Sequence, residues 1–153
     1  MKNEFNLSDI MPLMNEVLAG GGEFRFYPHG TSMLPLVRPG KDSVAIIRSD
    51  GKLKKFDIPL YRRDDGAYVL HRVYGIAKDG TYIICGDNQL VCEKGVRPDQ
   101  IIGKVCCIYR GNKKVPVHAF SQKVYMFLWC AVPIRRACLF IYRRFVRVFK
   151  RNV

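Results

Sequence analysis

The stretch IPLYRRDDGAYVLHRVYGIAKDGTYIIC, residues 58–85, decides the fold class of this 153-residue chain. It contains three short runs rich in β-branched and aromatic residues, and the pairs Asp65-Gly66 and Asp79-Gly80 separate them. An Asp-Gly pair between apolar runs is typical of a tight hairpin turn, because glycine adopts a positive φ without steric cost. The stretch therefore predicts consecutive antiparallel strands.

Similar runs continue on both sides of this stretch. The expected strands cover residues 24–27, 43–48, 58–61, 68–74, 81–85 and 101–109. A third Asp-Gly pair, Asp50-Gly51, follows the second run, and three such pairs predict an antiparallel meander. Because Pro59 cannot donate a backbone hydrogen bond, its run is expected at a sheet edge or at a bulge. We expect a mainly β, coiled antiparallel domain.

A short amphipathic helix is expected before the first strand. Apolar residues at positions 10, 13, 14, 17 and 18 recur at helical spacing after a group of capping residues at 6–9. Three glycines at 20–22 then end the pattern. Residues 1–120 are therefore expected to form one β domain with an N-terminal helix.

The last part of the chain, residues 121–153, differs in composition from the rest. The whole chain has a formal net charge of +13, and this tail holds eight Lys or Arg residues and no Asp or Glu. On a helical projection Arg136, Arg143 and Arg147 fall on one arc, opposite Phe145. A basic amphipathic helix of this kind is typical of a segment that lies in a membrane interface.

Three interpretations of this tail stay open. Its apolar run at 124–134 is too short to cross a bilayer, which takes about 20 apolar residues. The basic residues within 135–151 favour an anionic membrane surface over packing against the β domain, and they favour nucleic acid least. We expect the tail to hold the protein at the surface of a membrane.

The cysteines and the N-terminus bear on compartment and cofactors. Six cysteines show no CxxC pair and no Cys/His grouping at zinc spacing, so we expect reduced thiols, no metal site and no cofactor. No apolar signal segment precedes the first helix. The sequence therefore predicts a cytoplasmic protein, peripheral on the inner face of the membrane.

Ser32, His71 and Asp87 are the candidate catalytic residues. Ser32 lies in the irregular segment 30–35, and a serine hydroxyl is a weak nucleophile unless a base lies within hydrogen-bond reach. His71 lies in the middle of an expected strand, where its alternative role is that of a core histidine bonded to a backbone carbonyl. A three-residue turn at 78–80 would set His71 directly opposite Asp87, and a two-residue turn would shift the pairing by one residue. Nucleophile, base and orienting carboxylate would together suffice for acyl transfer.

Four segments that contain these residues follow one another in a specific order. They read GTSMLPLVRPGKDSVAI (30–46), LKKFDIPLYRR (53–63), YVLHRVYGI (68–76) and CGDNQLVCEKGVRPDQIIGKV (85–105). In this order they resemble the nucleophile, second-strand, general-base and Gly-Asp-Asn motifs of the signal-peptidase/SOS-repressor superfamily of serine peptidases. The resemblance covers roughly the whole β domain and implies a signal-peptidase-like fold.

The resemblance also implies roles for individual residues and an activity. It implies Ser32 as nucleophile, His71 as general base and Asp87 as the acidic residue of the histidine-type enzymes, with Thr31 and Ser32 forming the oxyanion hole and Met33 and Pro35 contacting substrate. The implied activity is that of a serine endopeptidase that cleaves leader- or signal-like precursor peptides without a cofactor. The alternative is a non-catalytic β domain that binds a membrane surface or nucleic acid through its Arg-rich tail.

Overall fold

The computed structural model describes residues 7–50 and 52–117, together with isolated positions between 119 and 140. The chain divides into two compact units, Met1–Val117 and His118–Val153. The first unit is mainly β, with antiparallel sheets and a short helix, which confirms the predicted fold class at this level. The basic helix predicted for 121–153 falls almost entirely outside the described residues.

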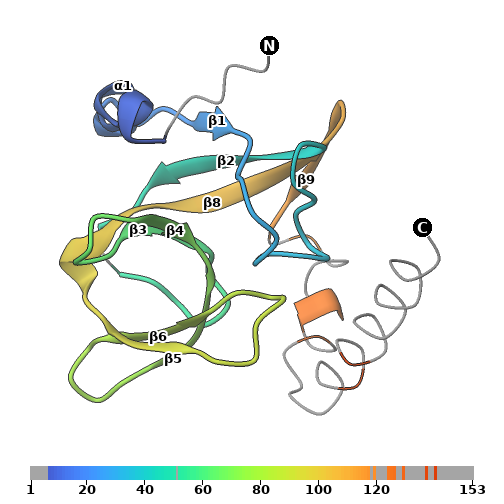
Figure 1. The fold of residues 1–153 in the computed structure, drawn as a ribbon. Coiled ribbons are helices and arrows are strands. Elements are labelled where there is room, and N and C mark those ends of the chain that lie inside the picture. The colour runs from blue at the N-terminus through green and yellow to red at the C-terminus, as the bar shows by residue number, and fades with distance from the viewer. Residues whose placement is uncertain are drawn as a thin grey trace. The chain divides into compact units, whose positions relative to one another are not determined.

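Two antiparallel sheets make up the first unit (Figure 1). The larger sheet has the strand order β1-β2-β8-β3-β4, with β9 also paired to β8, and the smaller sheet has the order β5-β6-β7. The elements are α1 (Leu7–Ala19), β1 (Phe24–Phe26), β2 (Asp42–Arg48), β3 (Pro59–Arg62), β4 (Tyr68–Leu70), β5 (Arg72–Ile76), β6 (Tyr82–Cys85), β7 (Glu93–Val96), the 3₁₀ turn Pro98–Gln100, β8 (Ile101–Arg110) and β9 (Lys113–Pro116).

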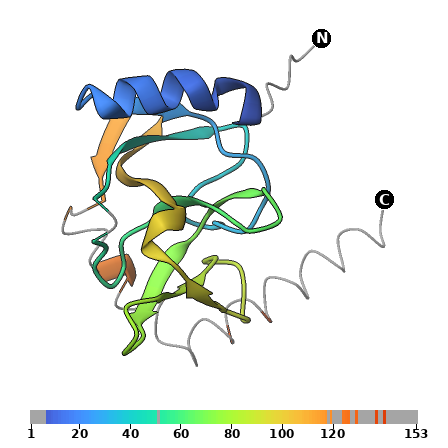
Figure 2. The ribbon, with the colours of Figure 1, turned by 90° about the vertical axis from the view of Figure 1, so that its left-hand side faces the viewer.

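The predicted N-terminal helix is present as α1, which packs beside β1 and β2 (Figure 2). Met14 and Leu18 on its apolar face are buried. At its end Gly21 has a φ of +78°, and the amide of Gly22 donates to the carbonyl of Val17 at 2.9 Å. This pair of glycines satisfies the last helical carbonyls, because glycine enters the left-handed region without strain.

Two of the three predicted Asp-Gly hairpins are present. Gly66 and Gly80 have φ values of +88° and +84° and lie in the turns that join β3 to β4 and β5 to β6. The third prediction is wrong, because the strands on either side of Asp50 do not pair with each other: β8 lies between β2 and β3 and pairs with both. A local turn signal does not reveal that a distant strand will insert, so the sheet is not a simple meander.

The strand predicted for 68–74 is broken in two at His71. Residues before it form β4 in the larger sheet, and residues after it form β5 in the smaller sheet. The run of β-forming residues at 68–74 shows no interruption at this point, and the two halves pair with different strands, β3 and β6. The break sets His71 at the passage between the two sheets, where Tyr61 and Val73 belong to one buried cluster.

Two strands, β7 and β9, were not predicted, and the position of Pro59 differs in part from the expectation. The strands β7 and β9 have the sequences EKGV and KKVP, which lack a run of β-forming residues, and they become strands by pairing with β6 and β8. Strand β3 is an interior strand, so the edge position considered for Pro59 is wrong. The bulge considered for it occurs beside it, between Leu60 and Tyr61.

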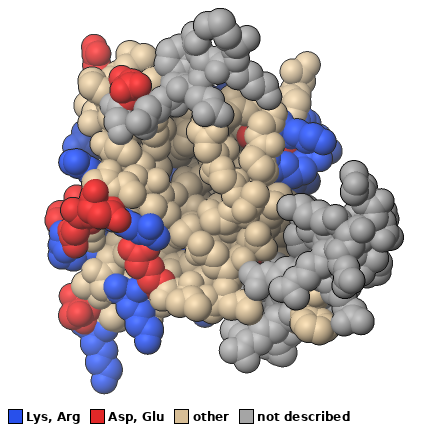
Figure 3. Space-filling model, in the orientation of Figure 1, with Lys and Arg blue, Asp and Glu red and all other residues tan. Residues whose placement is uncertain are grey.

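The described part of the chain shows a mixed charge distribution on one face and no membrane-spanning helix. On the face in Figure 3, acidic and basic side chains occur together toward the margins, and the middle carries mostly uncharged residues. Within the described residues, no helix has the length and apolar character needed to span a bilayer.

Candidate functional site

Ser32 lies in the connection between β1 and β2, in a segment of residues 30–37 that we call the serine turn. Two backbone hydrogen bonds fold this segment on itself: the amide of Leu34 donates to Thr31 at 3.2 Å, and that of Val37 donates to Met33 at 3.0 Å. The side chain of Met33 is buried, which anchors the turn, while Ser32 is half-buried.

A cavity of about 260 Å³ opens beside the serine turn and brings together side chains that are distant in the sequence. Its lining includes Ser32, Met33, Arg63, His71 and Gln89, together with the residues of β4. Two other predicted site residues, Thr31 and Pro35, are exposed and do not line it. The predicted nucleophile and the predicted base thus share one cavity.

His71 is enclosed on most sides. Its side chain is 4% exposed, and its ring centroid lies 6.4 Å from that of Tyr61. Burial, followed by the positive charge of Arg63, lowers the pKa of His71 from 6.5 to about 4, although Glu93 and Asp87 act in the opposite direction. The imidazole is therefore neutral at pH 7. Within the described residues, no direct hydrogen bond joins Ser32 to His71.

The predicted direct pairing of His71 with Asp87 is wrong. Near the turn Gly75 pairs with Ile83, as a three-residue turn requires, but a bulge between Val73 and Gly75 shifts the register, and Arg72 pairs with Cys85. A bulge changes the register by one residue, and Gly75, a glycine inside the strand, is the sequence feature that stands beside it.

The carboxylate of Asp87 binds Arg72 instead. The Nε and Nη2 atoms of Arg72 donate to the two oxygens of Asp87, each at 2.8 Å. Both side chains are almost completely buried, at 2% and 0% exposure. A bidentate Arg-carboxylate pair of this kind fixes geometry as well as charge.

The loop that carries Asp87 is attached to the serine turn. The amide of Asn88 donates to the carbonyl of Ser32 at 2.8 Å, and the Asn88 side chain donates to the carbonyl of Thr31 at 3.1 Å. At Gly86 a Cβ atom would lie 2.6 Å from the carbonyl oxygen of Ser32, so only glycine allows this close approach. The buried Arg72–Asp87 pair therefore fixes the backbone that holds Ser32.

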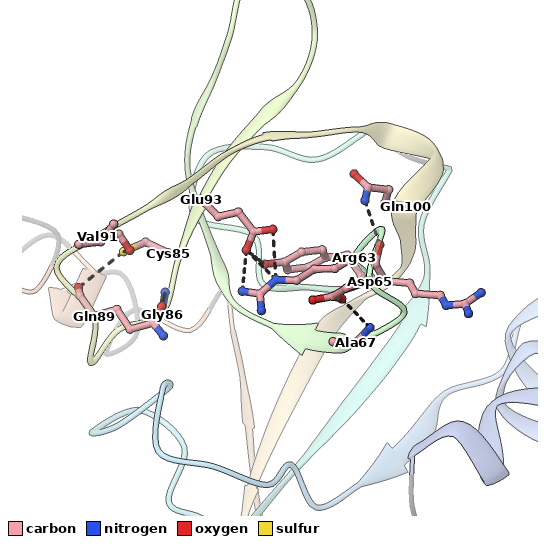
Figure 4. A network of polar contacts seen from close by, with 11 residues as sticks. Arg63, Asp65, Ala67, Cys85, Gly86, Gln89, Val91, Glu93 and Gln100 are labelled. Atoms are coloured by element: carbon pink, nitrogen blue, oxygen red, sulfur yellow. Dashed lines mark hydrogen bonds and ion pairs between the residues drawn. The ribbon is translucent and has the colours of Figure 1, made fainter.

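Glu93, which was not among the predicted site residues, acts on His71 through its charge and contacts Arg63. Its carboxylate accepts hydrogen bonds from Tyr61 Oη at 2.8 Å and from Arg63 Nε and Nη2 at 2.9 and 2.7 Å (Figure 4). Burial would raise the pKa of Glu93, but the hydrogen bonds from Arg63 and Tyr61, together with the charge of Arg63 and that of His71, outweigh it and lower this pKa. Of the carboxylates coupled to His71, Glu93 has the larger effect.

The sequence contains only a weak signal for Glu93. Glu93 is the only carboxylate between Asp87 and Asp99. It lies at the start of β7, which has no alternating pattern of its own, and β7 reaches the site only through its pairing with β6. Its importance follows from tertiary contacts with Tyr61 and Arg63.

The donors around the cavity are hydroxyl, imidazole, guanidinium and amide groups. Among the described residues, no group of three His, Cys, Asp or Glu side chains could hold a metal ion. The arrangement therefore offers a hydroxyl, a neutral imidazole and nearby fixed charges. No model of a known protein family matches this chain, and no curated protein matches it in sequence.

Proposed function

We propose that this protein is a serine endopeptidase of the signal-peptidase-like type, with Ser32 as nucleophile and His71 as general base. The observation that carries the proposal is that Ser32 and His71, from distant segments, line the same cavity. The proposed substrates are peptides or leader-bearing precursor proteins, met on the cytoplasmic side. The four sequence motifs that resemble the signal-peptidase superfamily support the same choice.

In the proposed reaction His71 takes the proton of the Ser32 hydroxyl while Oγ attacks the peptide carbonyl carbon. The amide of Ser32 stabilises the negative charge on the carbonyl oxygen. The Thr31 hydroxyl, which was predicted to share this role, does not line the cavity. His71 then gives its proton to the leaving amine as the peptide C–N bond breaks. In the second half His71 takes a proton from water as the water oxygen attacks the acyl carbonyl, and it returns that proton to Ser32 Oγ as the ester bond breaks. A general base often reaches hydrogen-bond distance from its nucleophile only when substrate is bound.

The two carboxylates have different roles in this proposal. Glu93 stabilises the imidazolium form of His71 through its negative charge. In support of this role, Glu93 raises the pKa of His71, whereas burial and Arg63 lower it. Asp87 acts as a positioning residue, because its carboxylate binds the buried Arg72 and its own loop contacts the serine turn. It keeps the Gly86–Asn88 backbone in place beside Ser32.

A peptide substrate is expected to bind in extended form along β4. This strand is at one end of the order β1-β2-β8-β3-β4, and Tyr68, Val69 and Leu70 line the cavity. Within the described residues β4 pairs only with β3, so its other edge offers backbone groups to an added strand. Main-chain pairing of this type accepts many sequences, while the cavity selects side chains.

The test is covalent labelling with an alkyl fluorophosphonate, in which serine Oγ replaces fluoride on phosphorus. We expect the wild-type protein to be labelled, Ser32→Ala to lose the label and His71→Ala to react at least about 100-fold more slowly. Ser49→Ala is the matched control, because Ser49 is half-buried but does not line the cavity. A wild-type protein that is neither labelled nor active on peptides, or a Ser32→Ala variant that labels normally, would refute the proposal.

A further inference from the structure

The cavity that contains Ser32 and His71 has a charged wall. Among its described lining residues Arg63 is the one permanent cation, and none is an aspartate or glutamate. Arg63 is 37% exposed, so its guanidinium reaches solvent while it is anchored in the protein. The one permanently charged side chain that lines this cavity is therefore a cation, and its ionic partner Glu93 is not among the lining residues.

The backbone and the side chain of Arg63 are both held in place. Its amide donates to the carbonyl of Ala67 at 2.9 Å, which closes the hairpin after β3. Its Nε and Nη2 atoms bind Glu93, and Figure 4 shows the guanidinium and the carboxylate facing each other. The orientation of the guanidinium is thereby fixed without substrate.

This arrangement leaves part of the guanidinium available. A guanidinium carries five N–H donors in a planar fork. Glu93 accepts from Nε and Nη2, and the hydrogen bonds to Glu93 leave the two N–H donors of Nη1 unused. A prepositioned cation with free donors binds a carboxylate with little loss of side-chain entropy.

We propose that Arg63 is a specificity-determining residue that selects substrates with a carboxylate side chain close to the bond that is cleaved. The inference rests on the proposed peptidase function and names a substrate class for the same site. The substrate carboxylate binds the Arg63 guanidinium inside the cavity, while the Ser32 hydroxyl attacks the peptide carbonyl in the same way for every substrate.

Binding of a carboxylate at Arg63 also acts on the base. The positive charge of Arg63 is one of the causes that lower the pKa of His71. A negative group beside Arg63 offsets that charge, so the imidazolium that forms during the reaction becomes easier to reach. An acidic substrate is therefore favoured both in binding and in proton transfer.

The experiment uses three fluorophosphonates with tails of equal length that end in a carboxylate, a carboxamide or an ammonium group. The quantity measured is the ratio of labelling rates within each protein variant, which cancels differences in the amount of folded protein. We expect the wild-type protein to react about tenfold faster with the carboxylate probe than with the carboxamide probe, and slowest with the ammonium probe.

Substitutions at Arg63 should change this ratio. Arg63→Gln should bring the carboxylate and carboxamide rates together, Arg63→Glu should make the ammonium probe fastest, and Arg63→Lys should keep a reduced preference for the carboxylate. Arg62→Gln is the matched control, because Arg62 is exposed, lies over the Tyr68 ring and does not line the cavity. Its ratio should equal that of the wild-type protein.

The outcomes separate the two proposals. A carboxylate preference that persists in Arg63→Gln and Arg63→Glu, or a wild-type protein that labels all three probes equally, overturns the role of Arg63 and leaves the peptidase function standing. A wild-type protein that reacts with none of the probes overturns both. A loss of preference in Arg62→Gln as large as in Arg63→Gln also overturns the role of Arg63, because the effect would then come from net charge alone.

Discussion

At the scale of single residues, the state of His71 is set by charges that the neighbouring strands supply. Arg63 follows β3 and Glu93 begins β7, and they act on the imidazole in opposite directions. They also bind each other, so the guanidinium and the carboxylate hold each other beside His71. The imidazole of His71 is therefore neutral and buried, and the negative charge of Glu93 favours its protonated form.

The first prediction concerns the pH dependence of labelling. Only neutral His71 accepts a proton, so the labelling rate should be constant from about pH 5 to pH 7 and fall as the pH decreases through about 4, the lowered pKa of His71. The same shift makes folding less favourable as pH falls from 6.5 toward about 4, because the unfolded chain takes up the proton first. A rate measured from pH 3.5 to 8 with a midpoint near 6.5 would contradict this assignment.

The second prediction concerns Glu93. Glu93→Gln removes the negative charge that favours imidazolium and leaves Arg63 without its ionic partner, so the labelling rate should fall by about tenfold or more. The expected change is in rate, while the urea midpoint of unfolding changes little, because the Glu93 side chain is partly exposed. Glu23→Gln is the control, since Glu23 pairs with Lys114 at the exposed surface. Equal rates for the two variants would show that Glu93 has no electrostatic role.

At the scale of secondary-structure elements, the connection from β6 to β7 decides where Ser32 lies. The loop after Cys85 holds the serine turn through Asn88 and the close approach at Gly86, and Asp87 ties that loop to the first residue of β5. The motif Gly-Asp-Asn was recognisable in the sequence, but the sequence did not show that its aspartate, Asp87, binds Arg72. The bulge in β5 makes Arg72 the residue that Asp87 reaches.

The third prediction follows from this attachment. Asp87→Asn removes the carboxylate charge that the buried Arg72 guanidinium binds, so the free energy of unfolding should fall by about 3–5 kcal/mol, with the labelling rate reduced as the serine turn loosens. Asp64→Asn is the control, because Asp64 pairs with Arg97 at the exposed surface and its removal should change stability very little. Urea unfolding of both variants measures the difference. A stable Asp87→Asn protein that labels slowly would instead indicate a direct role for Asp87 at His71.

At the scale of the whole molecule, the residues of the proposed site all belong to the unit Met1–Val117. We expect a chain that ends at Val117 to unfold in one cooperative transition and to react with an alkyl fluorophosphonate within about twofold of the full chain, because one compact unit with its own core generally folds alone. Thermal unfolding and labelling of the two chains measure this. An aggregated or unreactive shorter chain would mean that residues after 117 complete the domain.

The basic tail remains a prediction from sequence, since 121–153 lie almost entirely outside the described residues. The full chain should sediment with vesicles that contain anionic lipid and remain in solution with neutral vesicles, and the chain that ends at Val117 should bind neither. A full chain that ignores both kinds of vesicle would contradict the membrane role. RNA competition with a steep dependence on salt would favour nucleic acid instead.

The sequence by itself determined the helix, most of the strands and two hairpins, because periodicity and Asp-Gly turns act over a few neighbouring residues. It also pointed to Ser32 and His71 through motifs in a specific order. Only the tertiary structure decided that β8 separates β2 from β3, that His71 stands between two sheets, and that Glu93 shares its surroundings with Arg63. These features depend on pairing between distant segments and on one bulge, and local sequence does not encode which distant strand arrives.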